Sequence, residues 1–77
     1  METVVIDRSG QPITCEVVIW SNSRAFLSIP SDTGILPGDE FAFSKSGRRY
    51  VAHVLAMSFD TWIMFVRLKR EQSCFNE

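Results

Sequence analysis

Short runs in which apolar and polar residues alternate make up most of this chain. Successive side chains of a β-strand point to opposite faces, so such alternation predicts strands with one buried face. In Ile13–Trp20 one alternate set is fully apolar and is expected to face a core: Ile13, Cys15, Val17 and Ile19. The other set is expected to point outward: Thr14, Glu16, Val18 and Trp20.

Turn residues separate these runs. Pro37 presets φ at the first central position of Leu36–Asp39, and Gly38 supplies the positive φ that a type II turn needs at the second. Lys45-Ser46-Gly47 is predicted to form a hairpin loop. The predicted strands are Thr3–Asp7, Ile13–Trp20, Arg24–Ile29, Glu40–Ser44, Arg48–Met57 and Thr61–Leu68.

No window has a helical apolar stripe longer than about two turns. Short strands joined by hairpin-length loops are typical of small antiparallel barrels, in which closure removes exposed strand edges. A chain of 77 residues has room for only one domain of ordinary size. The sequence therefore predicts an all-β fold, a small six-stranded antiparallel β-barrel in a single domain (1–77), with the barrel over about 3–68 and a polar tail at 69–77.

Three stretches carry a resemblance to a known family. EVVIWSNSRAFLSIP, ILPGDEFAF and VAHVLAMSFDTWIMFVRL resemble, in this order, the second and third strands, the strand after Leu and Gly-Asp, and the closing hairpin of the PilZ domain. The resemblance extends over about Pro12–Leu68. It implies a six-stranded bacterial barrel with a signalling or regulatory role, in a family that typically binds cyclic di-GMP.

The nucleotide-binding residues of that family do not carry over. With Ser21 at the position of the family's serine, Ile19 stands where Asp or Asn is expected and Arg24 stands where Gly is expected. An Ile side chain cannot accept hydrogen bonds from guanine. The family's Arg-x-x-x-Arg segment has no counterpart, since the position four residues after Arg8 is Pro12. We therefore expect neither cyclic di-GMP binding nor any other cofactor.

The charge balance and the apolar runs indicate which partners and which location to expect. Lys and Arg number 8 against 9 Asp and Glu, a formal net charge of −1, whereas nucleic-acid-binding domains usually have a clear positive excess. The start METVVIDRSG is acidic where a secretory signal is basic. Val54–Met57 and Trp62–Val66 are far shorter than the ~20 residues that span a bilayer. These features predict a cytoplasmic protein without membrane insertion and without a nucleic-acid partner.

The chemistry-bearing residues do not form a catalytic or metal-binding pattern. Cys15 and Cys74 lack the further ligands that zinc requires, and both are expected to be reduced thiols. His53 is interpreted as a half-buried strand histidine with one backbone partner. The carboxylates near loops, which could in principle do acid–base work, are Asp32, Asp39 and Glu40. Because the turn already explains Asp39, we expect no enzyme and no metal site.

Basic residues gather in Arg48-Arg49 and in Arg67-Lys69-Arg70. If the last two strands pair as a hairpin, both clusters lie near the same end of the barrel, with Tyr50 and Trp20 near enough for stacking. Such a patch suits phosphate, a nucleic-acid backbone or an acidic protein surface, and the alternative is solvated arginines at strand ends. The candidate ligand-binding residues are Ser21, Arg24, Arg48, Arg49, Arg67, Lys69 and Arg70.

The last two predicted strands are apolar on both faces, although a barrel buries only one face of each strand. An apolar face left outside usually marks a protein interface, with a partner protein or in a homodimer. The candidate interface residues are Trp62, Ile63, Met64 and Phe65. We interpret the chain as a non-enzymatic, PilZ-like binding or regulatory module that acts through protein contacts. The alternative is a barrel that binds a nucleotide (cyclic di-GMP) or nucleic acid through its basic patch.

Overall fold

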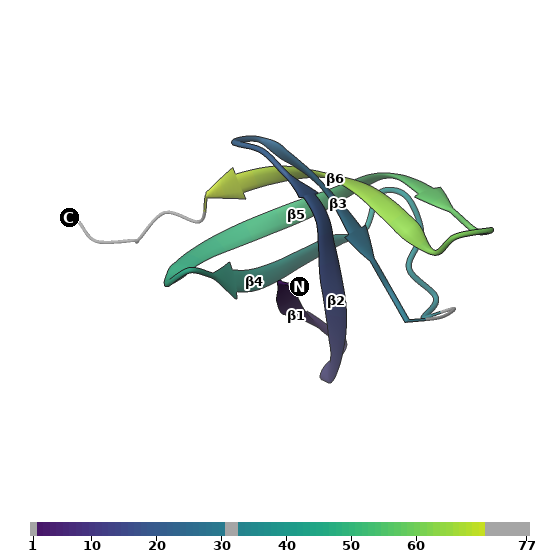
Figure 1. Cartoon of the computed structure of the whole chain (residues 1–77). Helices are drawn as coiled ribbons and strands as arrows, with labels where there is room; N and C mark the ends of the chain where they lie inside the picture. The colour runs from purple at the N-terminus through teal and green to yellow at the C-terminus, as the bar shows by residue number, and fades with distance from the viewer. Residues whose placement is uncertain (1, 31–32, 71–77) are drawn as a thin grey trace.

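The computed structural model describes residues 2–30 and 33–70, and the described chain is all β (Figure 1). No helix in this part of the chain has the length and hydropathy needed to cross a membrane. The six strands are β1 (Thr3–Arg8), β2 (Gln11–Trp20), β3 (Arg24–Ser28), β4 (Glu40–Lys45), β5 (Arg48–Ser58) and β6 (Ile63–Arg70).

The strands form one antiparallel sheet in the order β1-β2-β3-β6-β5-β4, which confirms the predicted fold class. The sheet curls until β1 comes beside β4, so the barrel is nearly closed (Figure 1). A 3.2 Å ion pair between Lys45 Nζ and Glu2 Oε2 joins these two edges. Among the described strands, β3–β6 is the one hydrogen-bonded ladder between strands that do not follow each other along the chain, and it positions the surface described below.

Two-residue turns close the β1–β2 and β4–β5 hairpins. Ser9 and Gly10 have φ of 52° and 86°, and Ser46 and Gly47 have φ of 53° and 77°, as type I′ turns require at both central positions. The predicted Leu36–Asp39 turn is also present, with Gly38 at φ 99° and a 3.1 Å bond from the Asp39 N–H to the Leu36 carbonyl. Local turn residues therefore determine where the chain reverses.

Alternate residues of the strands fill the barrel. The buried core comprises Val4, Ile6, Cys15, Ala25, Leu27, Ile29, Ile35, Phe41, Phe43, Ala52, Val54, Met64, Val66 and Leu68. These include alternate residues of β3 (Ala25 and Leu27), of β4 (Phe41 and Phe43) and of β6 (Met64, Val66 and Leu68). A core of this composition stabilises the fold because apolar surface leaves water.

One prediction about β2 is wrong at its C-terminal end. The register shifts between Val17 and Ile19, so Val18 is the extra residue of a β-bulge. The bulge inverts the alternation beyond it, which leaves Ile19 57% exposed and turns Trp20 inward against the core. Of the expected inward set, Cys15 is fully buried and Ile13 and Val17 are partly buried.

The end of the barrel also differs from the prediction. β6 continues through Lys69 and Arg70, because both residues pair with β5 instead of beginning a polar tail. The rest of the predicted tail, with Cys74, and the predicted loop carboxylate Asp32 lie outside the described residues.

Candidate functional site

An apolar row crosses the outer surface of four neighbouring strands. Ile19 lies directly opposite Phe26, Phe26 opposite Phe65, and Phe65 opposite Ala56, so one residue each from β2, β3, β6 and β5 stands in line. Ile19 and Phe26 are 57% and 37% exposed, and the ring centroids of Phe26 and Phe65 are 4.8 Å apart. These four residues are called the outer apolar row below.

A groove of about 360 Å³ runs beside this row along the β5–β6 hairpin. Phe26, Ala56, Met57, Ile63 and Phe65 supply an apolar lining. Two hydroxyls at the hairpin end complete it, and there Thr61 donates a 2.9 Å hydrogen bond to Ser58. The groove has the volume of a small ligand pocket but opens along the surface, a form that suits side chains of another protein.

The candidate interface residues separate into inner and outer ones. Ile63 and Phe65 point outward and are partly buried. Met64 has no exposed surface and belongs to the core, which corrects its place among the interface candidates, since Met64, Val66 and Leu68 share the inner face of β6. Trp62 has φ of 55° and packs partly against the core and, at 5.9 Å between ring centroids, against Phe59.

Two arginines border the outer apolar row. Arg24 on β3 lies directly opposite Arg67 on β6, and each stands two residues from the phenylalanine of its own strand, Phe26 or Phe65. Both are exposed, and neither guanidinium has an ion-pair partner among the described residues. Like charges in directly opposite positions destabilise a strand pair, so this arrangement has a cost to the isolated chain.

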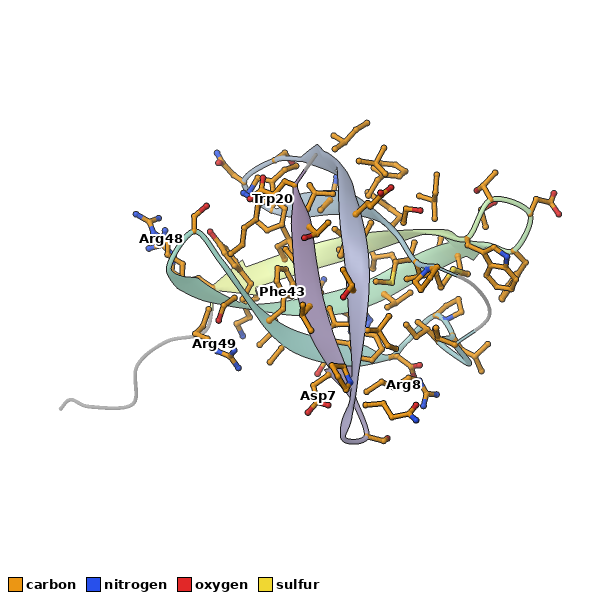
Figure 2. The ribbon with its side chains drawn as sticks, turned by 60° about the horizontal axis from the view of Figure 1, so that its bottom comes forward. Asp7, Arg8, Trp20, Phe43, Arg48 and Arg49 are labelled. Atoms are coloured by element: carbon orange, nitrogen blue, oxygen red, sulfur yellow. The ribbon has the colours of Figure 1, made fainter. Side chains whose placement is uncertain are left out.

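The other basic candidates lie at the hairpin end of β4 and β5. Figure 2 shows Arg48 and Arg49 at this end, apart from Asp7 and Arg8. Arg70 pairs with Tyr50 and Lys69 with Val51, which places both β6 residues toward the same end, as predicted. The Arg49 guanidinium donates a 3.1 Å hydrogen bond to Ser44 Oγ. The predicted clusters therefore share one end of the barrel, whereas Arg67 stands with Arg24 on the outer face.

Ser21 has a local structural partner. Its hydroxyl and its backbone N–H both donate 2.9 Å hydrogen bonds to the Arg24 carbonyl. These bonds close the turn between β2 and β3, which is the common use of a turn serine.

The aromatic rings that were expected near the basic end are packed against one another. Trp20 meets Phe43 and Tyr50 edge to face, with ring centroids 6.1 and 5.2 Å apart, and Trp20 packs against the core to which Phe43 belongs. Lys45 Nζ lies 4.4 Å from the centre of the Trp20 ring. Phe26 and Phe65 instead form an aromatic pair on the outer face, in the outer apolar row.

His53 and Cys15 lie in different surroundings. His53 Nδ1 lies 3.1 Å from Glu40 Oε2, so its partner is a side-chain carboxylate and the predicted backbone partner is wrong. Burial raises the pKa of the Cys15 thiol to about 11, which keeps it protonated and unreactive at neutral pH. Within the described residues, no three His, Cys, Asp or Glu side chains are grouped to hold a metal ion.

A second, polar pocket of about 220 Å³ lies where β1 and β4 run side by side without pairing. Its lining includes Asp7, Arg8, Asp39 and Glu40. Arg8 donates a 2.9 Å hydrogen bond to the Gly34 carbonyl, and Asp39 accepts one of 3.0 Å from the Leu36 N–H. The Arg8 bond ties the loop before β4 to β1, and the Asp39 bond closes the turn within that loop, so both side chains have structural roles.

Sequence reasoning found Ile63 and Phe65 but missed Ile19 and Phe26. The signal for Phe26 was present, because Ala25, Leu27 and Ile29 occupy the inner face and leave this large ring outside. Ile19 had no such signal, since the bulge that exposes it interrupts an otherwise regular alternation.

No protein-family model matches this sequence, and no curated protein or solved structure is significantly similar to it.

Proposed function

We propose that this protein is a non-enzymatic binding module that acts through protein–protein contacts made by the outer apolar row. The observation that carries the proposal is the lateral alignment of Ile19, Phe26, Phe65 and Ala56 beside an apolar groove. Contiguous apolar surface on a folded domain is typical of interfaces, and aromatic residues are enriched at their centres.

The outer apolar row by itself contributes a moderate free energy of binding. Burial of apolar surface contributes about 25 cal/mol per Å², so two phenylalanines and an isoleucine supply a few kcal/mol. Association itself costs ~4–15 kcal/mol in lost freedom of motion. The row therefore provides the centre of an interface, and polar groups around it have to add to the affinity and set its orientation.

The regulatory role, the cytoplasmic location and the PilZ-like character remain part of the proposal. The sequence pattern of Pro12–Leu68 supports the regulatory role and the PilZ-like character, which agree with a six-stranded antiparallel barrel. The shortness of the apolar runs Val54–Met57 and Trp62–Val66 supports the cytoplasmic location. A non-enzymatic role is supported by the buried, protonated Cys15 thiol and by the exposed His53–Glu40 pair, neither of which lines the groove.

Site-specific photo-crosslinking tests the proposal. A photoreactive phenylalanine at position 65 is expected to form adducts in cells that express the protein, and Ile19→Glu is expected to abolish them. The matched control has the same group at Val5, which is 52% exposed on β1, three strands away from β6 in the sheet. Equal crosslinking from positions 65 and 5, or adducts that persist in Ile19→Glu, would refute a specific contact at the row.

One observation favours the alternative function, binding of a nucleotide or single-stranded nucleic acid. Arg24 and Arg67 stand two residues from Phe26 and Phe65 on their strands, and stacking on aromatic rings beside cations is how such ligands are held. Calorimetry with cyclic di-GMP and anisotropy with a labelled single-stranded oligonucleotide test it. We expect no saturable micromolar binding in either assay; binding that falls steeply with salt and is lost in Arg24→Glu would establish the alternative.

A further inference from the structure

The two sides of the outer apolar row differ in charge. On β3, Arg24 stands two residues before Phe26 and Ser28 stands two residues after it. Ser28 pairs across the strands with Glu16 of β2, an exposed carboxylate on the outer face. A strand rises about 3.3 Å per residue, so a cationic and an acidic position lie about 7 Å from the row on opposite sides.

We propose that a second copy of this chain occupies the outer apolar row, related to the first by a two-fold axis that runs along the row. This inference rests on the proposed function and names its partner. Rotation about that axis lays the row on itself and reverses the strand direction. Arg24 of each protomer then faces Glu16 and Ser28 of the partner subunit, so the same contact forms twice.

The charges select this arrangement over the other two-fold packing of the same face. An axis parallel to the strands would bring Arg24 and Arg67 against the same two arginines of the other copy. Four uncompensated guanidiniums around one apolar contact would oppose association. With the axis along the row, each Arg24 gains a carboxylate, which offsets its repulsion from Arg67 across the strand pair.

Glu16 distinguishes a second copy from an unrelated partner. An acidic segment of another protein would satisfy Arg24 and Arg67 equally well, but it would leave Glu16 facing further negative charge or no partner. Only a surface that is acidic on one side of its apolar row and cationic on the other satisfies both. This chain has such a surface.

Charge-swap complementation tests the dimer. Wild type, Arg24→Glu and Glu16→Arg are compared by sedimentation velocity over a concentration series. Each single variant places like charges together at both contacts and is expected to raise the dissociation constant of the dimer tenfold or more. In an equimolar mixture of the two variants both contacts pair opposite charges, so the dissociation constant is expected to return to within about threefold of wild type.

Two controls isolate the contact. Val5→Glu adds a carboxylate on β1 and Asp7→Arg reverses a charge at the far end of β1, and both are expected to dimerise as wild type does. Phe65→Glu is expected to be monomeric and folded, as judged by circular dichroism.

Several results would overturn the inference: a wild-type monomer at every concentration, single variants that dimerise like wild type, or a mixture no better than its components. If the wild type is monomeric while position 65 still crosslinks to another protein, the second copy is excluded and the proposed function stands. If position 65 forms no specific adduct either, both are excluded. A monomer that binds the oligonucleotide through Arg24 also excludes both, in favour of the alternative.

Discussion

Replacement of Arg67 by Glu is expected to stabilise the folded chain. Arg67 lies directly opposite Arg24 on β3 and opposite His53 on β5, so it has no acidic cross-strand neighbour. Directly opposite like charges destabilise an antiparallel pair by about 0.2–1 kcal/mol, and opposite charges stabilise it by a similar amount. A glutamate at position 67 would convert the first case into the second.

The size of the effect follows from the register. Long side chains on directly opposite residues hold their charges about 7 Å apart when exposed, which gives about 0.6 kcal/mol of repulsion in a water-like dielectric. Screening reduces this to about 0.5 kcal/mol at 10 mM salt and about 0.25 kcal/mol at 150 mM. Because Arg67→Glu removes the repulsion and adds an attraction of equal size, the expected gain is about 1 kcal/mol at low salt and about 0.5 kcal/mol at 150 mM.

Urea denaturation followed by circular dichroism measures this gain. The protein concentration is kept in a range where the midpoint does not depend on it, so that association does not contribute. Arg67→Gln is expected to fall midway between wild type and Arg67→Glu, and a double-mutant cycle with Arg24→Gln isolates the pairwise energy. At low salt the gain corresponds to a rise in Tm of roughly 4–8 °C for a domain of this size.

The reasoning is refuted if Arg67→Glu is no more stable than Arg67→Gln. It is equally refuted if the gain persists unchanged at 1 M salt, where screening acts over about 3 Å. Either result would mean that the two guanidiniums do not interact across the strand pair.

Three further predictions concern the interior and the turns. Met64→Glu is expected to unfold the chain, since Met64 is fully buried, whereas Phe65→Glu leaves it folded; thermal denaturation would show equal effects if the face assignment were wrong. Gly47→Ala is expected to cost about 1–2 kcal/mol of folding stability, because φ is 77° and strains any L side chain, although no atom lies close to the added Cβ. Gly47→Asn is expected to cost less, since Asn adopts this conformation more readily. Equal urea midpoints for the two variants would contradict this. In a Cys74→Ser background, iodoacetamide is expected to label Cys15 only in urea. The pKa of the Cys15 thiol is about 11 in the folded chain and near 9.0 in the unfolded chain. The contribution of this thiol to folding stability is therefore complete below pH 9 and is lost as the pH rises through 11. A urea midpoint that stays constant between pH 9 and 11 would contradict this prediction.

Much of the barrel could be predicted because local chemistry determines it. Ser9-Gly10 and Ser46-Gly47 adopt the positive φ values that reverse the chain tightly, and Pro37-Gly38 forms the turn that leads into β4. Between the turns, alternation puts Leu27 and Phe43 in the apolar set of their strands, and both are buried. These features depend on residues a few positions apart, which is the range that a sequence pattern reports.

The two apolar faces of β6 show where that information ends. Alternation divides Ile63–Leu68 into two sets but does not say which set lies inside when both are apolar. The packing of Met64, Val66 and Leu68 against the other strands decides it, and Ile63 and Phe65 are left outside as a result. The bulge at Val18 also depends on tertiary structure, because bulges accompany the bending of strands as a barrel closes. This bulge puts Ile19 on the outer face and Trp20 on the inner face.

The candidate site depends most on a contact that no local pattern contains. The sequence by itself determined the strands, their turns and the apolar character of the last hairpin. Only the tertiary structure paired β3 with β6, and this pairing set Phe26 against Phe65 and Arg24 against Arg67. The physical reason is that the register between distant strands is set by how all their inner side chains pack together, and the outer face follows from that packing.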